Sequence, residues 1–185
     1  VLTSPGVWYL NHLKSEEGFH VSGASLPGVN GVMIGHNDKC AWGITLAYTD
    51  VEDIFIEKKC IENPNLYEYC GKKLNFTIIE EEILVKGKKP HIEMIKYSKH
   101  GPIIGKLVRN QNLTISLSSK SLEVLKLPEA IYKMNTSTSV DKFSDAVDEI
   151  LAPQLNIAYA DIDGNIGLFV SGRVPIRKSG NGQLP

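Results

Sequence analysis

Short apolar segments separated by Gly, Asn and Pro run through most of this chain, and they limit it to a fold made mainly of β-strands. Turn residues divide two longer stretches, residues 66–79 and 80–97, into expected β-hairpins. The other segments with strand character are residues 32–34, 41–44, 54–57, 113–117, 157–160 and 166–170.

Helical spacing of apolar residues is confined to one region in the second half of the chain. Its apolar residues are Val140, Phe143, Val147, Ile150 and Leu151. Ser139 is suited to cap the start of this helix, and Pro153 to end the segment. A shorter helix is expected over residues 130–134, after Pro128. The pattern therefore predicts an α+β chain that is mostly β.

The dipeptide Asp163-Gly164 predicts a two-residue turn between the last two strands, because Gly tolerates the positive φ that such a turn requires. The same segment, Asp161 to Asn165, begins like the calcium loop of an EF-hand. Position six of that loop would be Ile166 instead of Gly, and position twelve would be Gly172 instead of Glu. We therefore interpret the segment as a hairpin turn.

Composition limits the size and the partners of the chain. Its 185 residues, 42% of them hydrophobic, suffice for one core, and we expect residues 1–185 to form a single partial domain. A net charge of −1 argues against a nucleic-acid partner, because phosphate binding draws on clustered Lys and Arg. No apolar run reaches the length of a membrane span. These features do not assign a compartment.

Cysteine and histidine spacing gives no metal or redox motif. Because the chain has three cysteines, at least one of them cannot be in an intrachain disulfide. Cys60 and Cys70 either form a disulfide across an expected turn or are free thiols, as Cys40 then also is. No pair of histidines has the spacing of a zinc motif, and no Gly-x-Ser-x-Gly elbow is present.

Two segments carry most of the recognisable chemistry. Pro27 to Phe55 reads PGVNGVMIGHNDKCAWGITLAYTDVEDIF, a Gly-rich run that leads through His-Asn into a Trp-Gly-x-Thr turn and an acidic cluster. Asn156 to Gly167 reads NIAYADIDGNIG. Together with Ser4 to Tyr9 (SPGVWY) and the His-Gly-Pro at residues 100–102, they resemble the penicillin acylase family, which includes the acyl-homoserine-lactone acylases. The resemblance is strong over residues 5–57 and 156–182 and weak over residues 60–137.

The resemblance implies an N-terminal-nucleophile hydrolase that cleaves linear amides and folds as an αββα four-layer sandwich. In that family, self-cleavage of a precursor exposes a catalytic serine at the start of one chain. Here we expect the nucleophile upstream of Val1, so the sequence is interpreted as a fragment of the nucleophile-bearing chain, inactive by itself. Its expected partners are the remainder of the precursor and a small acyl-amide substrate.

The resemblance also implies an oxyanion hole, the pair of donors that binds the negative oxygen of the tetrahedral intermediate. Its members would be the carboxamide of Asn156 and the backbone N–H of Leu46, and such a donor lowers the barrier by about 2.7–4 kcal/mol. The alternative for Asn156 is a side chain that caps the preceding turn. Arg177 matches a family arginine near the active site, and would orient Asn156, meet the substrate or pair with a carboxylate.

Two further groups follow from the resemblance. Met33, Ile34 and Ile44 would line the acyl pocket. A calcium ion would take the carboxylates of Asp50 and Asp53 and the carbonyl of Glu52, which suits the preference of Ca²⁺ for oxygen ligands. Because other ligands come from the second chain, we expect this site to be empty in the present chain alone. The alternative is a solvated acidic turn.

A non-enzymatic reading competes with the acylase reading. In it, the chain is a β-rich binding module that uses Trp8, Tyr9 and Trp42 as a ligand platform. Exposure of these aromatic side chains would favour the binding module, and burial would favour the acylase.

Overall fold

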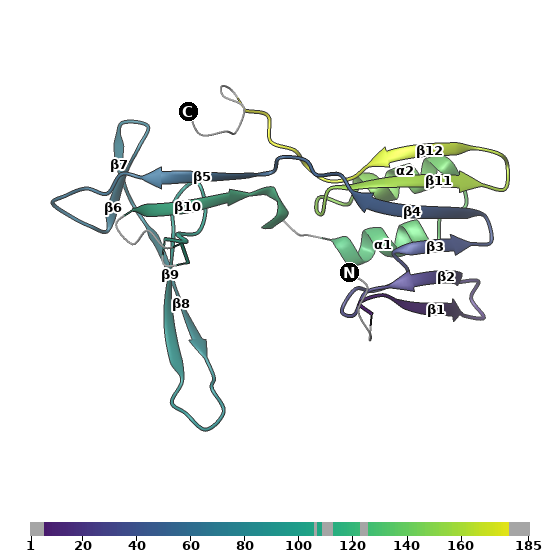
Figure 1. The fold of residues 1–185 in the computed structure, drawn as a ribbon, viewed down its shortest axis with the longest axis horizontal. Helices are drawn as coiled ribbons and strands as arrows, with labels where there is room; N and C mark the ends of the chain where they lie inside the picture. Colours follow the sequence, from purple (N-terminus) through teal and green to yellow (C-terminus); the bar gives the residue numbers. More distant parts are fainter. Residues whose placement is uncertain (1–5, 106, 109–112, 123–125, 178–185) are drawn as a thin grey trace. The chain divides into compact units, whose positions relative to one another are not determined.

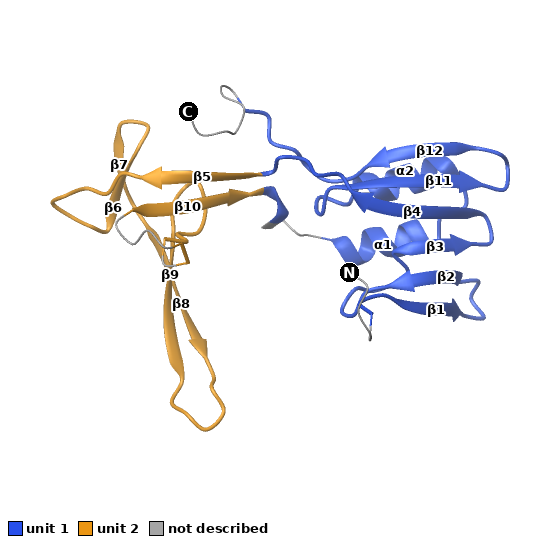
Figure 2. Cartoon of the chain, viewed as in Figure 1, with its two compact units in different colours: residues 1–51, 120–179 blue, residues 52–119, 180–185 orange. Residues whose placement is uncertain are grey.

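The computed structural model describes residues 6–105, 107–108, 113–122 and 126–177. The chain divides into two compact units (Figure 2). Unit 1 contains residues 1–51 and 120–179, and unit 2 contains residues 52–119 and 180–185. The expectation of a single partial domain over residues 1–185 stays a prediction about the longer protein, and each unit is described here by itself.

Unit 1 is built on a six-stranded sheet in which all neighbouring strands are antiparallel. The strand order is β1-β2-β3-β4-β11-β12. The pairing of β4 with β11 joins segments more than 100 residues apart in the sequence and places both in the interior of the sheet. The bounds are β1 (Tyr9–Lys14), β2 (His20–Ser25), β3 (Ile34–Asn37), β4 (Cys40–Leu46), β11 (Leu155–Asp161) and β12 (Ile166–Val170).

Two helices, α1 (Leu127–Asn135) and α2 (Val140–Asp148), cover one face of this sheet (Figure 1). The side chain of Ser139 accepts a hydrogen bond from the backbone N–H of Lys142 and so caps α2 as the sequence predicts. Pro128 lies in the first turn of α1, where its missing N–H costs no helical hydrogen bond. A short 3₁₀-helix, Lys120–Leu122, precedes them.

The core of unit 1 lies between this sheet and the helices. Leu155, Ile157 and Tyr159 of β11 are buried against Phe143 and its neighbours, and the residues between them point to the opposite side. We call that opposite side the open face, because neither helix covers it. On β12 the open face carries Ile166, Leu168 and Val170, each more than half exposed.

Two glycines allow close approach of β2 and β3. Gly23 and Gly35 are directly opposite each other in the pairing. A Cβ atom on Gly23 would lie 2.1 Å from the carbonyl oxygen of Ile34, and one on Gly35 would lie 2.1 Å from that of Ser22. No other residue fits at either position without displacing backbone.

Unit 2 consists of three antiparallel two-stranded ribbons. Their strands are β5 (Glu52–Glu57) with β10 (Thr114–Ser119), β6 (Leu66–Tyr69) with β7 (Lys72–Asn75), and β8 (Thr77–Ile83) with β9 (His91–Tyr97). A small buried cluster includes Tyr67 and Phe76, whose rings stack. None of the described helices is long and apolar enough to cross a membrane.

The predicted class, α+β and mostly β, is confirmed, as are both hairpins of unit 2 and both helices. Three local predictions were wrong. Trp42 to Thr45 lies inside strand β4 and forms no turn. The turn between β11 and β12 spans the four residues 162–165 instead of the two that were predicted. The carboxylate of Asp161 stabilises this longer loop by accepting hydrogen bonds from Asp163 and Asn165. Val32 and Met33 precede β3.

Two strands were not predicted from the sequence, and the state of the cysteines had been left open. Strands β1 and β2 were not predicted, since β2 is rich in small and polar residues. All three cysteines are free thiols in this structure, Cys40 and Cys60 buried and Cys70 exposed.

Candidate functional site

Asn156 is the second residue of β11, and its side chain lies on the open face of unit 1. The carboxamide nitrogen is 3.4 Å from Oγ1 of Thr45 and 3.3 Å from the carbonyl oxygen of Leu46. Both contacts are long and solvent-exposed. The donor is therefore held at the end of β4 by weak hydrogen bonds, which a stronger acceptor can replace.

The backbone N–H of Leu46 points away from β11. The backbone N–H of Ala47 donates to the carbonyl of Gln154, and that of Ser171 donates to the carbonyl of Leu155. Hydrogen-bonded and non-hydrogen-bonded pairs alternate in an antiparallel ladder. Since Ala47 and Gln154 are hydrogen-bonded, the adjacent pair of Leu46 and Leu155 is a non-hydrogen-bonded pair. The amide of Leu46 therefore faces the other edge of β4, beyond the last residue that β3 pairs.

The structure thus brings Asn156 and Leu46 to one end of the β4–β11 pair. Each has a neutral N–H donor, one from a side chain and one from the backbone. Neutral donors of this kind stabilise a developing oxyanion without adding a charge that water must solvate. That the two donors act on one oxygen stays a prediction.

Arg177 lies against Asp50, four residues after Leu46. Its Nη2 is 3.2 Å from Oδ2 of Asp50, and both terminal nitrogens are 3.5 Å from the Asp50 carbonyl oxygen. Of the three roles that the sequence left open for Arg177, pairing with a carboxylate is the one seen here. The pair ties the segment after β12 to the segment after β4.

The three acidic residues proposed for calcium fall in different units. Asp50 belongs to unit 1, and Glu52 and Asp53 begin β5 in unit 2. Oε1 of Glu52 accepts a hydrogen bond from Ser119. Within the described residues, no group of three or more His, Cys, Asp or Glu side chains gathers as a metal site would. The donors themselves, carboxylates and a carbonyl, match the hard-oxygen chemistry of Ca²⁺, so the calcium site stays a prediction.

The residues expected to line the acyl pocket divide between the two faces of the sheet. Met33 is buried in the core, and Ile44 packs against the same core. Ile34 lies on the open face, since it alternates with Gly35, whose partner Trp42 is buried beneath the helices. The structure brings Met33 and Ile44 together but places Ile34 on the side of Asn156.

The three aromatic residues of the competing binding-module reading do not form one surface. Trp42 is only 4% exposed, and its indole N–H donates to the carbonyl of Met33 at 3.0 Å. Trp8 and Tyr9 are 46% and 45% exposed. Because Trp42 belongs to the core, a platform of all three is ruled out.

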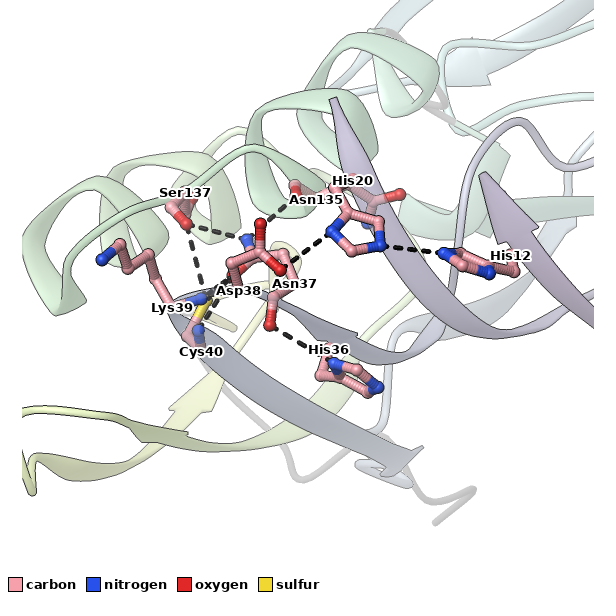
Figure 3. Close-up of polar contacts among 9 residues, drawn as sticks. All are labelled: His12, His20, His36, Asn37, Asp38, Lys39, Cys40, Asn135 and Ser137. Atoms are coloured by element: carbon pink, nitrogen blue, oxygen red, sulfur yellow. Dashed lines mark hydrogen bonds and ion pairs between the residues drawn. The ribbon is translucent and has the colours of Figure 1, made fainter. Parts of the chain in front are cut away.

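Sequence reasoning missed an amide network in unit 1 that joins α1 to the segments before and after β3 (Figure 3). Asn135 of α1 accepts from the backbone N–H of Val32 at 2.7 Å and donates to its carbonyl at 2.8 Å. The side-chain nitrogen of Asn37 donates to the carbonyls of Asn135 and Ser137. The His36-Asn37 pair stands out in the sequence. Nothing in the sequence, however, predicted that Asn37 would bind the backbone at the C-terminal end of α1.

Electrostatics argue against Cys40 as an internal nucleophile. Burial raises the pKa of the Cys40 thiol, and the nearby Asp161 adds to the effect, while a hydrogen bond with Asn37 acts the other way. The pKa of Tyr159 is raised by burial and by its hydrogen bond to Asp161. Both groups therefore stay neutral near pH 7, and neutral thiols are poor nucleophiles.

Comparisons with known proteins point to one family of hydrolases. The profile of the penicillin amidase family matches residues 1–185. Acyl-homoserine lactone acylase QuiP of Pseudomonas fluorescens strain Pf-5 is 32% identical over 182 residues, covering 96% of this chain and 22% of that protein. Penicillin G acylase of Escherichia coli is 30% identical over 184 residues, covering 94% of this chain and 21% of that protein.

A solved structure is also similar. Thermostable penicillin G acylase from Alcaligenes faecalis aligns with a TM-score of 0.77 and 27% identity, over 91% of this chain and 30% of that chain. The mostly β fold, with helices on one face of the sheet, is thus that of a known class of hydrolase. The chain belongs to the penicillin amidase family. It spans about a fifth of the length of the curated relatives named above.

Proposed function

We propose that this chain is the part of an amidohydrolase that holds the oxyanion during cleavage of a linear acyl amide. The observation that carries the proposal is the meeting of the Asn156 carboxamide and the Leu46 peptide at one end of the β4–β11 pair. The names of the relatives, acylases of penicillin G and of acyl-homoserine lactones, support an N-acyl substrate.

In this proposal, a serine upstream of Val1 attacks the amide carbonyl, with its own α-amino group as general base. The carbonyl oxygen becomes negative and accepts hydrogen bonds from Nδ2 of Asn156 and the N–H of Leu46. Asn156 then exchanges its long contact with Thr45 for a short one to the oxyanion. Because both donors belong to paired strands of one sheet, little reorganisation would be needed at the transition state.

Calcium would have a structural part in the longer enzyme. Asp50, Asp53 and the carbonyl of Glu52 would hold it together with ligands from another chain. When bound, the ion supplies a fixed positive charge that joins segments of the precursor. The ion pair with Arg177 keeps the carboxylate of Asp50 oriented.

The test uses the longer protein that contains this chain, assayed on N-acyl-homoserine lactones of several chain lengths and on a phenylacetyl amide. We expect Asn156→Ala to lower kcat by roughly 100-fold or more and to leave the melting temperature nearly unchanged, because only a donor to developing charge is removed.

Asn165→Ala, in the turn at the far end of β11, is the matched control and should keep the wild-type kcat. A variant Asn156→Ala with undiminished kcat would remove the basis of the proposal. Absence of turnover on every amide by the wild-type enzyme would remove the proposed activity itself.

A further inference from the structure

A hydrogen bond between two histidines joins strand β1 to the rest of the sheet in unit 1 (Figure 3). Nε2 of His12, on β1, is 2.8 Å from Nε2 of His20, on β2. The ring centroids are 5.0 Å apart, so the rings meet head-on, as a linear hydrogen bond requires. Nδ1 of His20 is 2.9 Å from Oδ1 of Asp38, in the turn between β3 and β4. The proposed function uses none of these three residues.

The contact with Asp38 determines where the protons of the neutral pair lie. A carboxylate accepts hydrogen bonds, so a neutral His20 carries its proton on Nδ1 and accepts with Nε2. His12 must then donate from Nε2, and its own Nδ1 has no proton. One proton therefore lies between the two Nε2 atoms.

Protons added to this pair have opposite effects in turn. A first added proton makes one ring an imidazolium, which still donates to the lone pair of the neutral ring, and a charged donor strengthens the hydrogen bond. A second added proton gives both rings an N–H at Nε2. No acceptor then remains between them, and two positive charges face each other. The contact between His12 and His20 is therefore compatible with one added proton and incompatible with two.

Strand β1 is held to the sheet by few other contacts. In the described sheet it pairs with β2 alone. Five of its six residues are exposed, so little apolar surface holds it in place. Segments of this kind open locally at a low cost in free energy. A side-chain contact between β1 and β2 therefore has a measurable effect on how often the strand opens.

Other charged groups lie around the two rings on each neighbouring segment. They are Lys14 on β1, opposite His20, Glu16 and Glu17 in the β1–β2 turn, His36 on β3, and Asp38 and Lys39 in the β3–β4 turn. The C-terminal end of α1 lines a small pocket beside His20 with the uncharged Asn135, Thr136 and Ser137. Of these groups, all within the described residues, Asp38 alone is in ion-pair contact with either ring.

We propose that His12 and His20 form a pH-dependent contact that holds β1 to the sheet while the pair carries at most one added proton. When each ring carries two protons, the side-chain contact is lost. The backbone pairing of β1 with β2 then remains but opens more often. Both rings reach solvent, since His12 is exposed and the side chain of His20 is 34% exposed, so protons enter without a change of fold.

The first test is a pH titration of the purified chain by NMR, following the imidazole nitrogen shifts from about pH 8 to about pH 5, where histidines ordinarily change charge. We expect the shifts of His12 and His20 to change in two shared steps, because groups in contact titrate as a pair. In His12→Gln, His20 should titrate in a single step, since the Gln amide replaces Nε2 as a donor and takes up no proton.

The second test is hydrogen exchange of the β1 amides over the same pH range, corrected for the intrinsic effect of pH. Their protection should fall by roughly 2–10-fold over the second step, the effect expected for the loss of one hydrogen bond. His12→Gln should abolish this fall. Strand β12, at the other end of the strand order, is the internal control, and its protection should not follow the step.

Two exposed histidines provide matched control variants. His36→Gln, on β3, and His91→Gln, in unit 2, should leave the shared steps and the pH dependence of β1 unchanged. Circular dichroism establishes that each variant keeps its fold. The proposal is overturned if His12 and His20 each titrate in one step whose midpoint does not change when the other is replaced by Gln. It is also overturned if β1 loses protection equally in the wild type and in His12→Gln.

Discussion

At the scale of single residues, Asn135 links helix α1 to the backbone before β3. It is 2% exposed, and its amide satisfies both the N–H and the carbonyl of Val32. Gly31, just before, has a φ of +87°, and a Cβ there would lie 2.8 Å from Oδ1 of Asn135. One helix side chain therefore fixes the backbone that leads into β3 and positions Met33.

Replacing Asn135 by Leu should lower the free energy of unfolding by about 2 kcal/mol or more, since two buried backbone groups of Val32 lose their partners. Urea unfolding followed by Trp fluorescence measures the loss. Asn11→Leu, on the edge strand β1, is the control and should change stability little. Equal stability of the two variants would contradict the assigned role of Asn135.

The sequence predicted that Asn156 and Leu46 meet at one site, and the pairing of β4 with β11 brings them close together. Their catalytic roles stay predictions. The contact between His12 of β1 and His20 of β2 was not predicted, since it depends on a hairpin that the sequence did not predict. Asn135 was missed for a similar reason: its partner Val32 is 103 residues away.

At the scale of elements, the β5–β10 ribbon of unit 2 contains a buried carboxylate. Glu57 ends β5 and accepts hydrogen bonds from Nδ1 of His100 at 2.9 Å and from Ser116 of β10 at 2.7 Å. The ring of His100 stacks on Phe55 with centroids 3.8 Å apart. These contacts attach the His-Gly-Pro turn to the ribbon. The role of that motif in this chain is therefore structural.

The pKa of Glu57 predicts how the stability of unit 2 changes with pH. Burial acts to raise this pKa, but hydrogen bonds from Ser98, Ser116 and His100 and the charge of His100 outweigh it, so the pKa is lowered from 4.5. The folded state therefore holds its proton less tightly than the unfolded state. The stabilisation is fully present above about pH 4.5 and is lost as the pH falls through the folded-state value.

The matching measurement compares wild type with Glu57→Gln by amide hydrogen exchange in β5 and β10, corrected for the intrinsic effect of pH. The stability difference should be largest at neutral pH and should shrink as the pH falls below about 4.5. Glu68→Gln, an exposed position on β6, is the control and should show a smaller difference at neutral pH. A difference for Glu57→Gln that is constant with pH would show that the carboxylate charge is not involved.

Most elements could be predicted from sequence because their apolar residues alternate or recur at helical spacing. The exceptions have physical reasons. Strand β2 contains His, Ser, Gly and Ala, and its strand geometry depends on the Gly23–Gly35 approach to β3. Trp42 to Thr45 contains a Gly that suggested a turn, yet pairing with β11 holds it extended in the interior of the sheet.

At the scale of the whole molecule, residues 52–119 of unit 2 are a continuous insertion between two segments of unit 1. Residues 52–119 leave unit 1 after Val51 and return to it at Lys120. The backbone N–H of Lys120 donates to the carbonyl of Val51 at 3.1 Å. Inside unit 2, Glu52 and Ser119 are directly paired. The two ends of the insertion are therefore adjacent in both units.

This adjacency predicts that unit 1 folds without unit 2. A hydrogen bond from Lys120 to Val51 is the bond that closes a β-turn, so replacing residues 52–119 by Asn-Gly should join the ends without strain. We expect the shortened chain to keep the Trp42 environment of the intact chain, as measured by fluorescence and near-ultraviolet circular dichroism. Loss of that signal would mean that the sheet of unit 1 depends on the insertion.

Such a junction has a consequence for how a family of sequences can diverge. A segment whose two ends meet at one hydrogen-bonded pair can gain or lose residues in a gene without shifting the register of any strand that carries Asn156 or Leu46. Insertions and deletions in the coding region for residues 54–119 would therefore leave the strand pairing of unit 1 intact.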